Sequence, residues 1–387
     1  MTIQIAHLNE QVLSNAKVVL ADEVICGSVC IKNGAIADIS QGQYAPNGAT
    51  DCDGDYICAG LVELHTDNLE RHLQPRPGAK WPVKAAILSH DAELASVGIT
   101  TVFDALRVGS IPSGKTPKYG KYAREVANYI LEMQASNQMR ISHFIHLRAE
   151  VCSETLLDEL AEFSATDRVR IVSLMDHTPG QRQFRDISKM EEYCTGKYGM
   201  TKDEVFAHFE LLYTLRDTYG VAHEEGAAKI GKKLGAVLAS HDDTTASDVS
   251  TSSGKGVKIA EFPTTFEAAQ ASVDAGISVM MGAPNLLRGG SHSGNVAAHE
   301  LAENGLLDIL SSDYAPSSLL MGAVRLGLDT GDMARGLRTV TQAPANAVDL
   351  QDRGEIKTGL RADLIRFNVS DDLPLIKGVW RQGQRVS

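Results

Sequence analysis

The 387-residue sequence has few cysteines, no long apolar run and no excess of basic residues. Its six cysteines include no Cys-x-x-Cys pair and are too sparse for a disulfide framework, so we expect reduced, mostly buried thiols. No stretch approaches the about 18 consecutive apolar residues of a membrane span. The N-terminal segment lacks the basic and apolar regions of a signal peptide. These absences predict a cytoplasmic protein.

Acidic residues outnumber basic ones, 49 against 37, which gives a net charge of −12. This balance argues against general binding to nucleic acid or to acidic membranes, but local arginines still allow an anionic small substrate. Hydrophobic residues make up 43% and charged residues 22%, as in soluble globular proteins. The length fits two domains or one barrel with an accessory domain, and leaves a homo-oligomer open.

Two textures divide the chain. Residues 1 to about 59 alternate short β-rich runs with turns such as Asn33-Gly34 and Asn47-Gly48, a pattern typical of small antiparallel sheets. The stretch from about residue 344 has the same texture. We therefore predict a β-sandwich domain of residues 1–59 plus 344–387, and a separate domain of residues 60–343.

Between the two ends, apolar strand-like runs alternate with amphipathic helical ones, the signature of parallel βα units. The candidate strands are 61–64, 100–103, 144–147, 171–175, 236–240, 257–260, 278–281 and 308–312. The candidate helices are 84–96, 121–134, 155–163, 265–275 and 296–304. Eight strands close a (β/α)8 TIM barrel. The segment 177–235 is too long for a simple connection and is expected to carry extra structure, such as a lid or substrate loop.

Metal-type side chains follow most of these strands. His65 and Asp67 are two residues apart, so an extended strand would present both to one cation. The other strand ends carry Asp104, Arg148 with Glu150, Asp176 with His177, His241 with Asp242 and Asp243, Glu261, Asn285 and Asp313. Catalytic groups of such barrels lie at the carboxyl ends of the strands. Nitrogen and oxygen ligands without thiolate suit zinc, manganese or iron.

These motifs resemble the amidohydrolase superfamily, whose members carry strand-end ligands and a β-sandwich shared by the two termini. Within it, they are similar to the PhnM family of phosphonate-metabolism proteins. The resemblance covers nearly the whole chain and rests on long motifs, which are His65-Thr-Asp-Asn-Leu-Glu70, Ser173-Leu-Met-Asp-His-Thr-Pro-Gly-Gln-Arg182, Ser240-His-Asp-Asp243, Ala260-Glu-Phe-Pro263, Met281-Gly-Ala-Pro-Asn285, Arg288-Gly-Gly-Ser-His292 and Leu310-Ser-Ser-Asp-Tyr314.

The resemblance implies hydrolysis of α-D-ribose 1-methylphosphonate 5-triphosphate to the 5-phosphate and diphosphate, in the carbon–phosphorus lyase pathway. Carried over by position, it places one or two divalent metal ions, zinc first and manganese or iron as alternatives. The implied ligands are His65, Asp67, Glu150, His241 and Asp313, followed by His177 and Glu261. Asp67 stands where most members have a second His, and no Lys follows the fourth strand, so the metal count stays open.

A bound divalent ion lowers the pKa of its water to about 7, which supplies hydroxide at neutral pH. Asp313 and His241 are the predicted catalytic residues, with Asp313 as the general base. Phosphate oxygens need a clamp of basic side chains, because a guanidinium binds them in pairs. The candidates for this clamp are Arg76, Arg107, Arg148, Arg182, Arg185, Arg288 and His292.

The sequence leaves several residue roles open. An exposed charge is the commoner role of a single Arg, but Arg182 and Arg288 lie in Gly-containing segments that read as loops. His177 could be a ligand or a loop anchor, and His292 a substrate contact or a turn residue. His146 is expected to pack or to support a ligand, and Asp242 to orient His241 or cap a helix.

Two other functions compete with triphosphate hydrolysis. A cyclic-amide hydrolase, deaminase or deacetylase of the same superfamily would keep the metal but have fewer basic loop residues. A non-catalytic scaffold barrel would have lost ligands, whereas His65, His241 and Asp313 are retained.

Overall fold

The structure is a computed structural model that describes residues 10–43, 47–76, 78–113, 120–182, 187–291 and 294–387. The chain falls into two compact units. The first comprises Met1–Val102, Asn137–Ser142 and Ser312–Ser387, and the second comprises Phe103–Ser136 and His143–Ser311. In the part of the chain that is described, no helix has both the length and the apolar character to span a bilayer.

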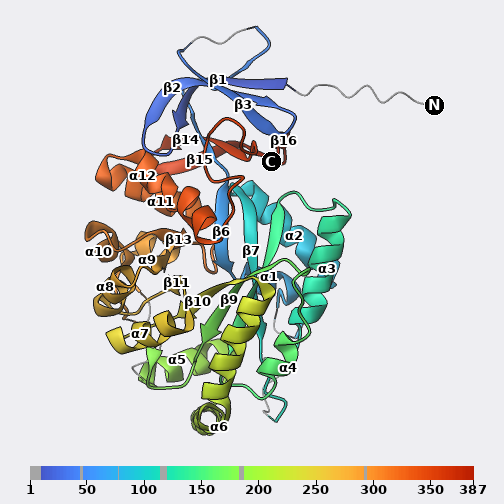
Figure 1. The fold of residues 1–387 in the computed structure, drawn as a ribbon, viewed down its shortest axis with the longest axis vertical. Coiled ribbons are helices and arrows are strands. Elements are labelled where there is room, and N and C mark those ends of the chain that lie inside the picture. The colour runs from blue at the N-terminus through green and yellow to red at the C-terminus, as the bar shows by residue number, and fades with distance from the viewer. Residues whose placement is uncertain (1–9, 44–46, 77, 114–119, 183–186, 292–293) are drawn as a thin grey trace, which may run out of the picture. The chain divides into compact units, whose positions relative to one another are not determined.

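The two ends of the chain build one β domain within the first unit (Figure 1). Its strands are β1 (Glu10–Val19), β2 (Val24–Lys32), β3 (Ala35–Gln41), β4 (Thr50–Asp51), β5 (Tyr56–Ala59), β14 (Leu364–Ser370), β15 (Leu373–Arg381) and β16 (Gln384–Arg385). They hydrogen-bond in the order β16-β15-β14-β5-β1-β2-β3, and β4 pairs with β1. The antiparallel pairing of β5 with β14 joins the N-terminal strands to the C-terminal ones.

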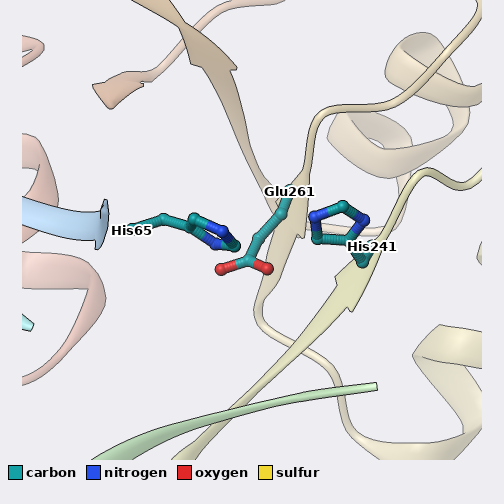
Figure 2. A group of neighbouring side chains, drawn as sticks. All are labelled: His65, His241 and Glu261. Carbon is teal, nitrogen blue, oxygen red and sulfur yellow. The ribbon is translucent and has the colours of Figure 1, made fainter. Parts of the chain in front are cut away.

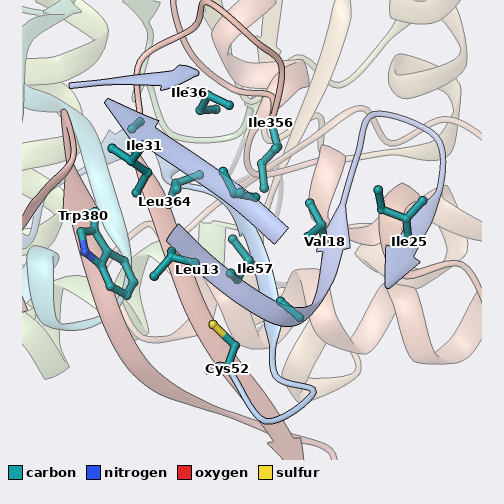
Figure 3. Packing of buried hydrophobic residues seen from close by; sticks show 13 residues of the cluster. Leu13, Val18, Ile25, Ile31, Ile36, Cys52, Ile57, Ile356, Leu364 and Trp380 are labelled. Atoms are coloured by element: carbon teal, nitrogen blue, oxygen red, sulfur yellow. The ribbon is translucent and has the colours of Figure 1, made fainter. Parts of the chain in front are cut away.

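A single apolar cluster fills this β domain. Leu13, Val18, Ile31, Ile57 and Leu364 are each no more than 1% exposed, and Figure 3 shows them packed between the strands with Trp380 at the edge. Alternating burial along β2 reflects one buried and one exposed sheet face. The predicted union of the two termini is therefore confirmed. Its strands form one continuous sheet by hydrogen bonding.

The central strands form the predicted barrel. They are β6 (Leu61–Thr66), β7 (Ile99–Val108), β8 (Ser142–Glu150), β9 (Val169–Met175), β10 (Val237–His241), β11 (Ile259–Glu261), β12 (Ser278–Gly282) and β13 (Ile309–Ser311), and they follow one another in this order. An isolated parallel bridge between Thr66 and Asp313 nearly closes the sheet. Almost every residue of these strands is buried, because both faces of a parallel sheet are covered.

All eight predicted strands are confirmed. Several strands run past their predicted ends, however, and β7 does so by the most residues. β7 runs on to Val108, so Asp104 lies inside the strand, where its Oδ2 is 2.7 Å from Nδ1 of His143. Both side chains are fully buried, so Asp104 is a structural partner of His143 and not a strand-end ligand.

The helices include all five that the sequence pattern indicates, with bounds shifted by up to three residues. The described helices are α1 (Asn68–Leu73), α2 (Val83–Ser96), α3 (Ala123–Ala135), α4 (Leu156–Leu160), α5 (Ile187–Tyr198), α6 (Lys202–Leu234), α7 (Ala246–Lys255), α8 (Phe266–Asp274), α9 (Ala283–Arg288), α10 (Ala298–Glu303), α11 (Ser318–Thr330), α12 (Met333–Arg338) and α13 (Gln342–Ala347).

The extra structure expected in segment 177–235 consists of α5 and the 33-residue helix α6. Thr201 and Glu204 form a capping box at the start of α6, in which each side chain binds the other residue's backbone N–H. Gly235 ends the helix in the left-handed conformation, which glycine adopts without steric cost. The capping box and Gly235 thus set where α6 begins and ends.

Candidate active site

His241 and Glu261 lie next to each other at the carboxyl ends of β10 and β11. They are register partners on these parallel strands and are 7% and 1% exposed. Glu261 Oε2 accepts a hydrogen bond from Ser173 Oγ at 2.5 Å, and Glu261 Oε1 is 3.6 Å from His146 Nε2. Because Ser173 and His146 come from β9 and β8, four neighbouring strands contribute to one buried polar cluster.

A second group joins His241 to residues that follow β9 and β10. Candidate ligand atoms of His177, His241 and Asp242 lie within 4.8 Å of one another. Nδ1 of His241 pairs with the Asp242 carboxylate, and Nδ1 of His177 pairs with the Glu150 carboxylate at the end of β8. Such carboxylate partners fix the orientation of an imidazole and make Nε2 a better metal ligand.

The Glu150–His177 pair has shifted pKa values. Burial by itself would raise the pKa of Glu150, but the nearby His177 holds it below the ordinary value. Burial would lower the pKa of His177, but Glu150 raises it above the ordinary value. The pair therefore favours a carboxylate facing a protonated imidazole. Because a histidine ligand must be deprotonated, metal binding at His177 would release that proton.

Asp176 does not belong to the His177–His241–Asp242 group and binds other side chains. Its Oδ1 accepts from the Thr178 hydroxyl at 2.6 Å and from the Cys152 thiol at 3.2 Å, and its Oδ2 is 2.8 Å from Nε of Arg216 on α6. Burial would raise the pKa of Asp176, but Thr178 and Arg216 keep it below its ordinary value. Of the two residues after β9, His177 joins the His241 group, whereas Asp176 binds α6.

Arg182 is tied to the backbone and side chain of the β10 end. Its Nη1 donates to the carbonyl oxygen of His241 at 2.7 Å and to Oδ1 of Asp243 at 2.9 Å. Asp243 Oδ2 also accepts from Ser252 Oγ at 3.0 Å. Burial raises the pKa of Asp243, and Arg182 opposes that shift. Arg182 therefore supports the segment that carries His241.

In the first unit, His65 and Asp313 lie on adjacent segments. Thr66 Oγ1 donates to the carbonyl oxygen of Asp313 at 2.8 Å, beside the bridge between these residues. Asp67 is the N-cap residue of α1, one position beyond β6, so strand alternation does not set its direction. The expectation that a single extended strand presents both His65 and Asp67 was wrong in this respect.

His65 also belongs to a group of ligand-type side chains. Figure 2 shows His65, His241 and Glu261 as neighbours, and their candidate ligand atoms lie within 4.8 Å of one another. All three residues are buried. His241 is thus common to two groups of potential metal ligands.

The predicted basic residues have varied surroundings. Arg107, in β7, donates to the carbonyl oxygens of Gly109 and Gly120, and Arg148, in β8, has its Nε 3.4 Å from the sulfur of Met175. Arg76 is exposed. Arg288 is exposed and is the last residue of helix α9, so its expected place in a loop was wrong. Arg185 and His292 lie outside the described residues.

Sequence reasoning missed Glu63, Ser173 and His208. Glu63 lies two residues before His65 on β6, so the same period-two argument could have found it. Ser173 has no distinctive pattern, because a serine inside a strand is common. His208 is buried in α6, where burial lowers its pKa and the charge of Glu150 opposes the shift. The sequence does not show that His208 lies near Glu150, because this proximity depends on how α6 packs.

Solved structures show the same fold across nearly the whole chain. Dihydropyrimidinase from Brevibacillus agri has a TM-score of 0.62 and 12% identity, with 97% of this chain and 94% of that chain covered. N-acetylglucosamine-6-phosphate deacetylase from Pasteurella multocida has a TM-score of 0.60 and 12% identity, with 97% and 99% covered. N-isopropylammelide isopropylaminohydrolase from Burkholderia multivorans has a TM-score of 0.63 and 14% identity, with 97% of each chain covered. The fold is that of amidohydrolase-superfamily barrels.

No family model matches the chain. The chain is 44% identical to a curated protein of Escherichia coli strain K12 over 378 residues, which cover 97% of this chain and 100% of the relative. That relative is named alpha-D-ribose 1-methylphosphonate 5-triphosphate diphosphatase. This chain belongs to the family of that enzyme.

Proposed function

We propose that this protein is a metal-dependent hydrolase that cleaves α-D-ribose 1-methylphosphonate 5-triphosphate to the 5-phosphate and diphosphate. The observation that carries the proposal is 44% identity across the full length of the diphosphatase from E. coli. The buried nitrogen and oxygen ligands at the barrel strand ends support it, because the catalytic groups of such barrels lie at the carboxyl ends of the strands. The wider setting we propose is phosphonate catabolism in the cytoplasm.

The donor set fits a divalent cation. Two ligand atoms of a tetrahedral zinc ion are about 3.3–3.4 Å apart, which falls inside the 4.8 Å limit that contains each group of candidate atoms. The two groups share His241, which supports one or two ions. We propose zinc first, with manganese or iron as alternatives, because the ligands are imidazoles and carboxylates without thiolate. The proposed ligands are His65, Asp67, Glu150, His177, His241, Glu261 and Asp313.

When bound, a divalent cation supplies Lewis acidity, which polarises a phosphoryl oxygen and makes water a nucleophile near neutral pH. Asp313 is our candidate for the base that takes a proton from the attacking water. His241 is kept in orientation by Asp242, and Glu261 by Ser173. These contacts hold the reacting groups in place before substrate arrives.

The anionic substrate requires positive charge around the phosphates. We propose that this charge comes from Arg76, Arg107, Arg148, Arg182, Arg185, Arg288 and His292. Arg182 contributes mainly by fixing the His241 segment, since Asp243 and the His241 carbonyl oxygen already bind its Nη1.

We also propose that residues 1–59 plus 344–387 and residues 60–343 are the two structural domains.

The decisive test is product analysis by 31P NMR on purified protein with the ribose triphosphate. We expect diphosphate and the 5-phosphate with zinc or manganese present, and neither with excess chelator. His241→Ala should reduce the rate by at least a hundredfold. His299→Ala, which changes an exposed histidine on α10, is the matched control and should leave the rate unchanged. Release of monophosphate alone, or turnover of a neutral cyclic amide instead, would contradict the proposal.

A further inference from the structure

We propose that Glu63 is a positioning residue that holds the backbone of His65 and of the segment before Asp313 in the geometry their side chains need. The inference rests on the proposed function, because it takes His65 and Asp313 as site residues. Glu63 itself is fully buried in β6. It is not assigned a role in metal binding or in proton transfer.

The contacts of Glu63 connect two distant parts of the sequence. Oε1 accepts a hydrogen bond from the backbone N–H of His65 at 2.8 Å. Oε2 accepts one from the backbone N–H of Ser312 at 2.6 Å. One carboxylate therefore spans β6 and the residue directly before Asp313. Both contacts lie within the first compact unit.

A second bond supports the same junction. The hydroxyl of Thr66 donates to the carbonyl oxygen of Asp313, next to the parallel bridge between these two residues. Asp313 has a φ of 53°, a left-handed conformation that is unusual for a residue with a side chain. Such a conformation persists only where surrounding contacts enforce it. Glu63 and Thr66 provide contacts on either side of it.

The chemistry of this junction requires a carboxylate. Each oxygen of Glu63 faces an N–H donor, and a buried carboxylate can accept both bonds. In Glu63→Gln the side chain has nearly the same shape, but its amide NH2 would face one of the two N–H groups. The backbone at His65 or at Ser312 must then move. Loss of a residue that orients metal ligands typically lowers metal affinity or activity by about 10–100-fold.

Asp91 offers a matched control. Its buried carboxylate also accepts backbone N–H bonds, from Arg140 at 3.0 Å and Ile141 at 3.1 Å, but none of these three residues is a proposed ligand. Asp91→Asn and Glu63→Gln therefore make the same chemical change at two places. We expect both to lower the unfolding temperature, and only Glu63→Gln to weaken metal binding.

The experiment is a titration of metal-depleted wild type, Glu63→Gln and Asp91→Asn with zinc and with manganese. We expect the zinc dissociation constant to rise at least tenfold in Glu63→Gln and less than twofold in Asp91→Asn. Equal dissociation constants in all three would overturn the inference but leave the proposed function standing. A wild type that binds neither ion would overturn the proposed function as well.

A second pair of variants covers the case in which Glu63→Gln does not fold. Thr66→Val removes the hydroxyl bond to the Asp313 carbonyl oxygen, whereas Thr66→Ser keeps it. We expect weaker zinc binding in Thr66→Val and near-normal binding in Thr66→Ser. Identical affinities in this pair would show that the junction does not position the site.

Discussion

Replacing Arg182 with methionine should destabilise the protein, because it breaks the ion pair between Arg182 and the buried Asp243. Arg182 Nη1 is 2.9 Å from Asp243 Oδ1, and the two side chains are 16% and 1% exposed. At this distance the gross attraction is about 6 kcal/mol for an effective dielectric constant of about 20, before desolvation is subtracted. Breaking a buried pair from one side costs about 3–5 kcal/mol. Because Ser252 still donates to Asp243, we expect the lower end, about 3 kcal/mol.

The assay is urea unfolding at pH 7.5 in the presence of chelator, with the shift in midpoint converted through the slope of the transition. Arg325→Met is the control, since Arg325 and Asp329 form an exposed pair on α11, 57% and 50% exposed. An exposed pair of this kind contributes about 0–1 kcal/mol. Equal midpoint shifts in the two variants would refute the reasoning.

The sign of the pH dependence gives an independent check. Burial raises the pKa of Asp243 above its ordinary value, and Arg182 opposes this shift. Without Arg182 the pKa of Asp243 should rise further, so that the Asp243 carboxylate takes up a proton more readily in the folded state than in the unfolded state. Stability gained from a raised carboxyl pKa is present at low pH and lost as pH increases through the folded-state value. The difference in free energy of unfolding between wild type and Arg182→Met should therefore become smaller from pH 7.5 to pH 5. A difference that does not change with pH would contradict the charge argument.

Three further results are expected. Burial raises the pKa of Glu93, but hydrogen bonds from neighbouring side chains lower it to about 2; Glu93→Gln should therefore cost about 1–2 kcal/mol at pH 7, and urea unfolding should show that cost fading as pH falls from about 4.5 towards 2. Gly60→Ala would place a Cβ 2.2 Å from Oγ1 and 2.4 Å from Cγ2 of Thr100, so calorimetry should show a loss of about 1–3 kcal/mol, partly recovered by adding Thr100→Ala. Zinc at a hundred times its dissociation constant should stabilise the wild type by about 2.7 kcal/mol, and His241→Ala should abolish most of that gain.

The barrel strands could be predicted from the sequence because each is buried on both faces and reads as a short apolar run. The helix α7 could not, since its sequence is rich in Ser and Thr and has few apolar residues to mark a buried face. Helix α9 was missed for a different reason. Gly289 and Gly290 read as a loop, whereas Gly289 is the left-handed residue that ends the helix after Arg288.

The residue types at the strand ends could be predicted, but their partners could not. Nothing in the sequence indicates that Asp176 binds Arg216 on α6 while the adjacent His177 pairs with Glu150. Such choices depend on side-chain direction and on contacts between residues far apart in the chain. The position of Asp67 shows the same limit, because β6 ends one residue before it.

The most direct test of the central claim is the release of diphosphate from α-D-ribose 1-methylphosphonate 5-triphosphate by the metal-loaded protein. We predict diphosphate and the ribose 5-phosphate in equal amounts, loss of turnover on chelation, and its return when zinc or manganese is added back. Turnover that persists without metal, or a metal-loaded protein that leaves the triphosphate intact, would contradict the account.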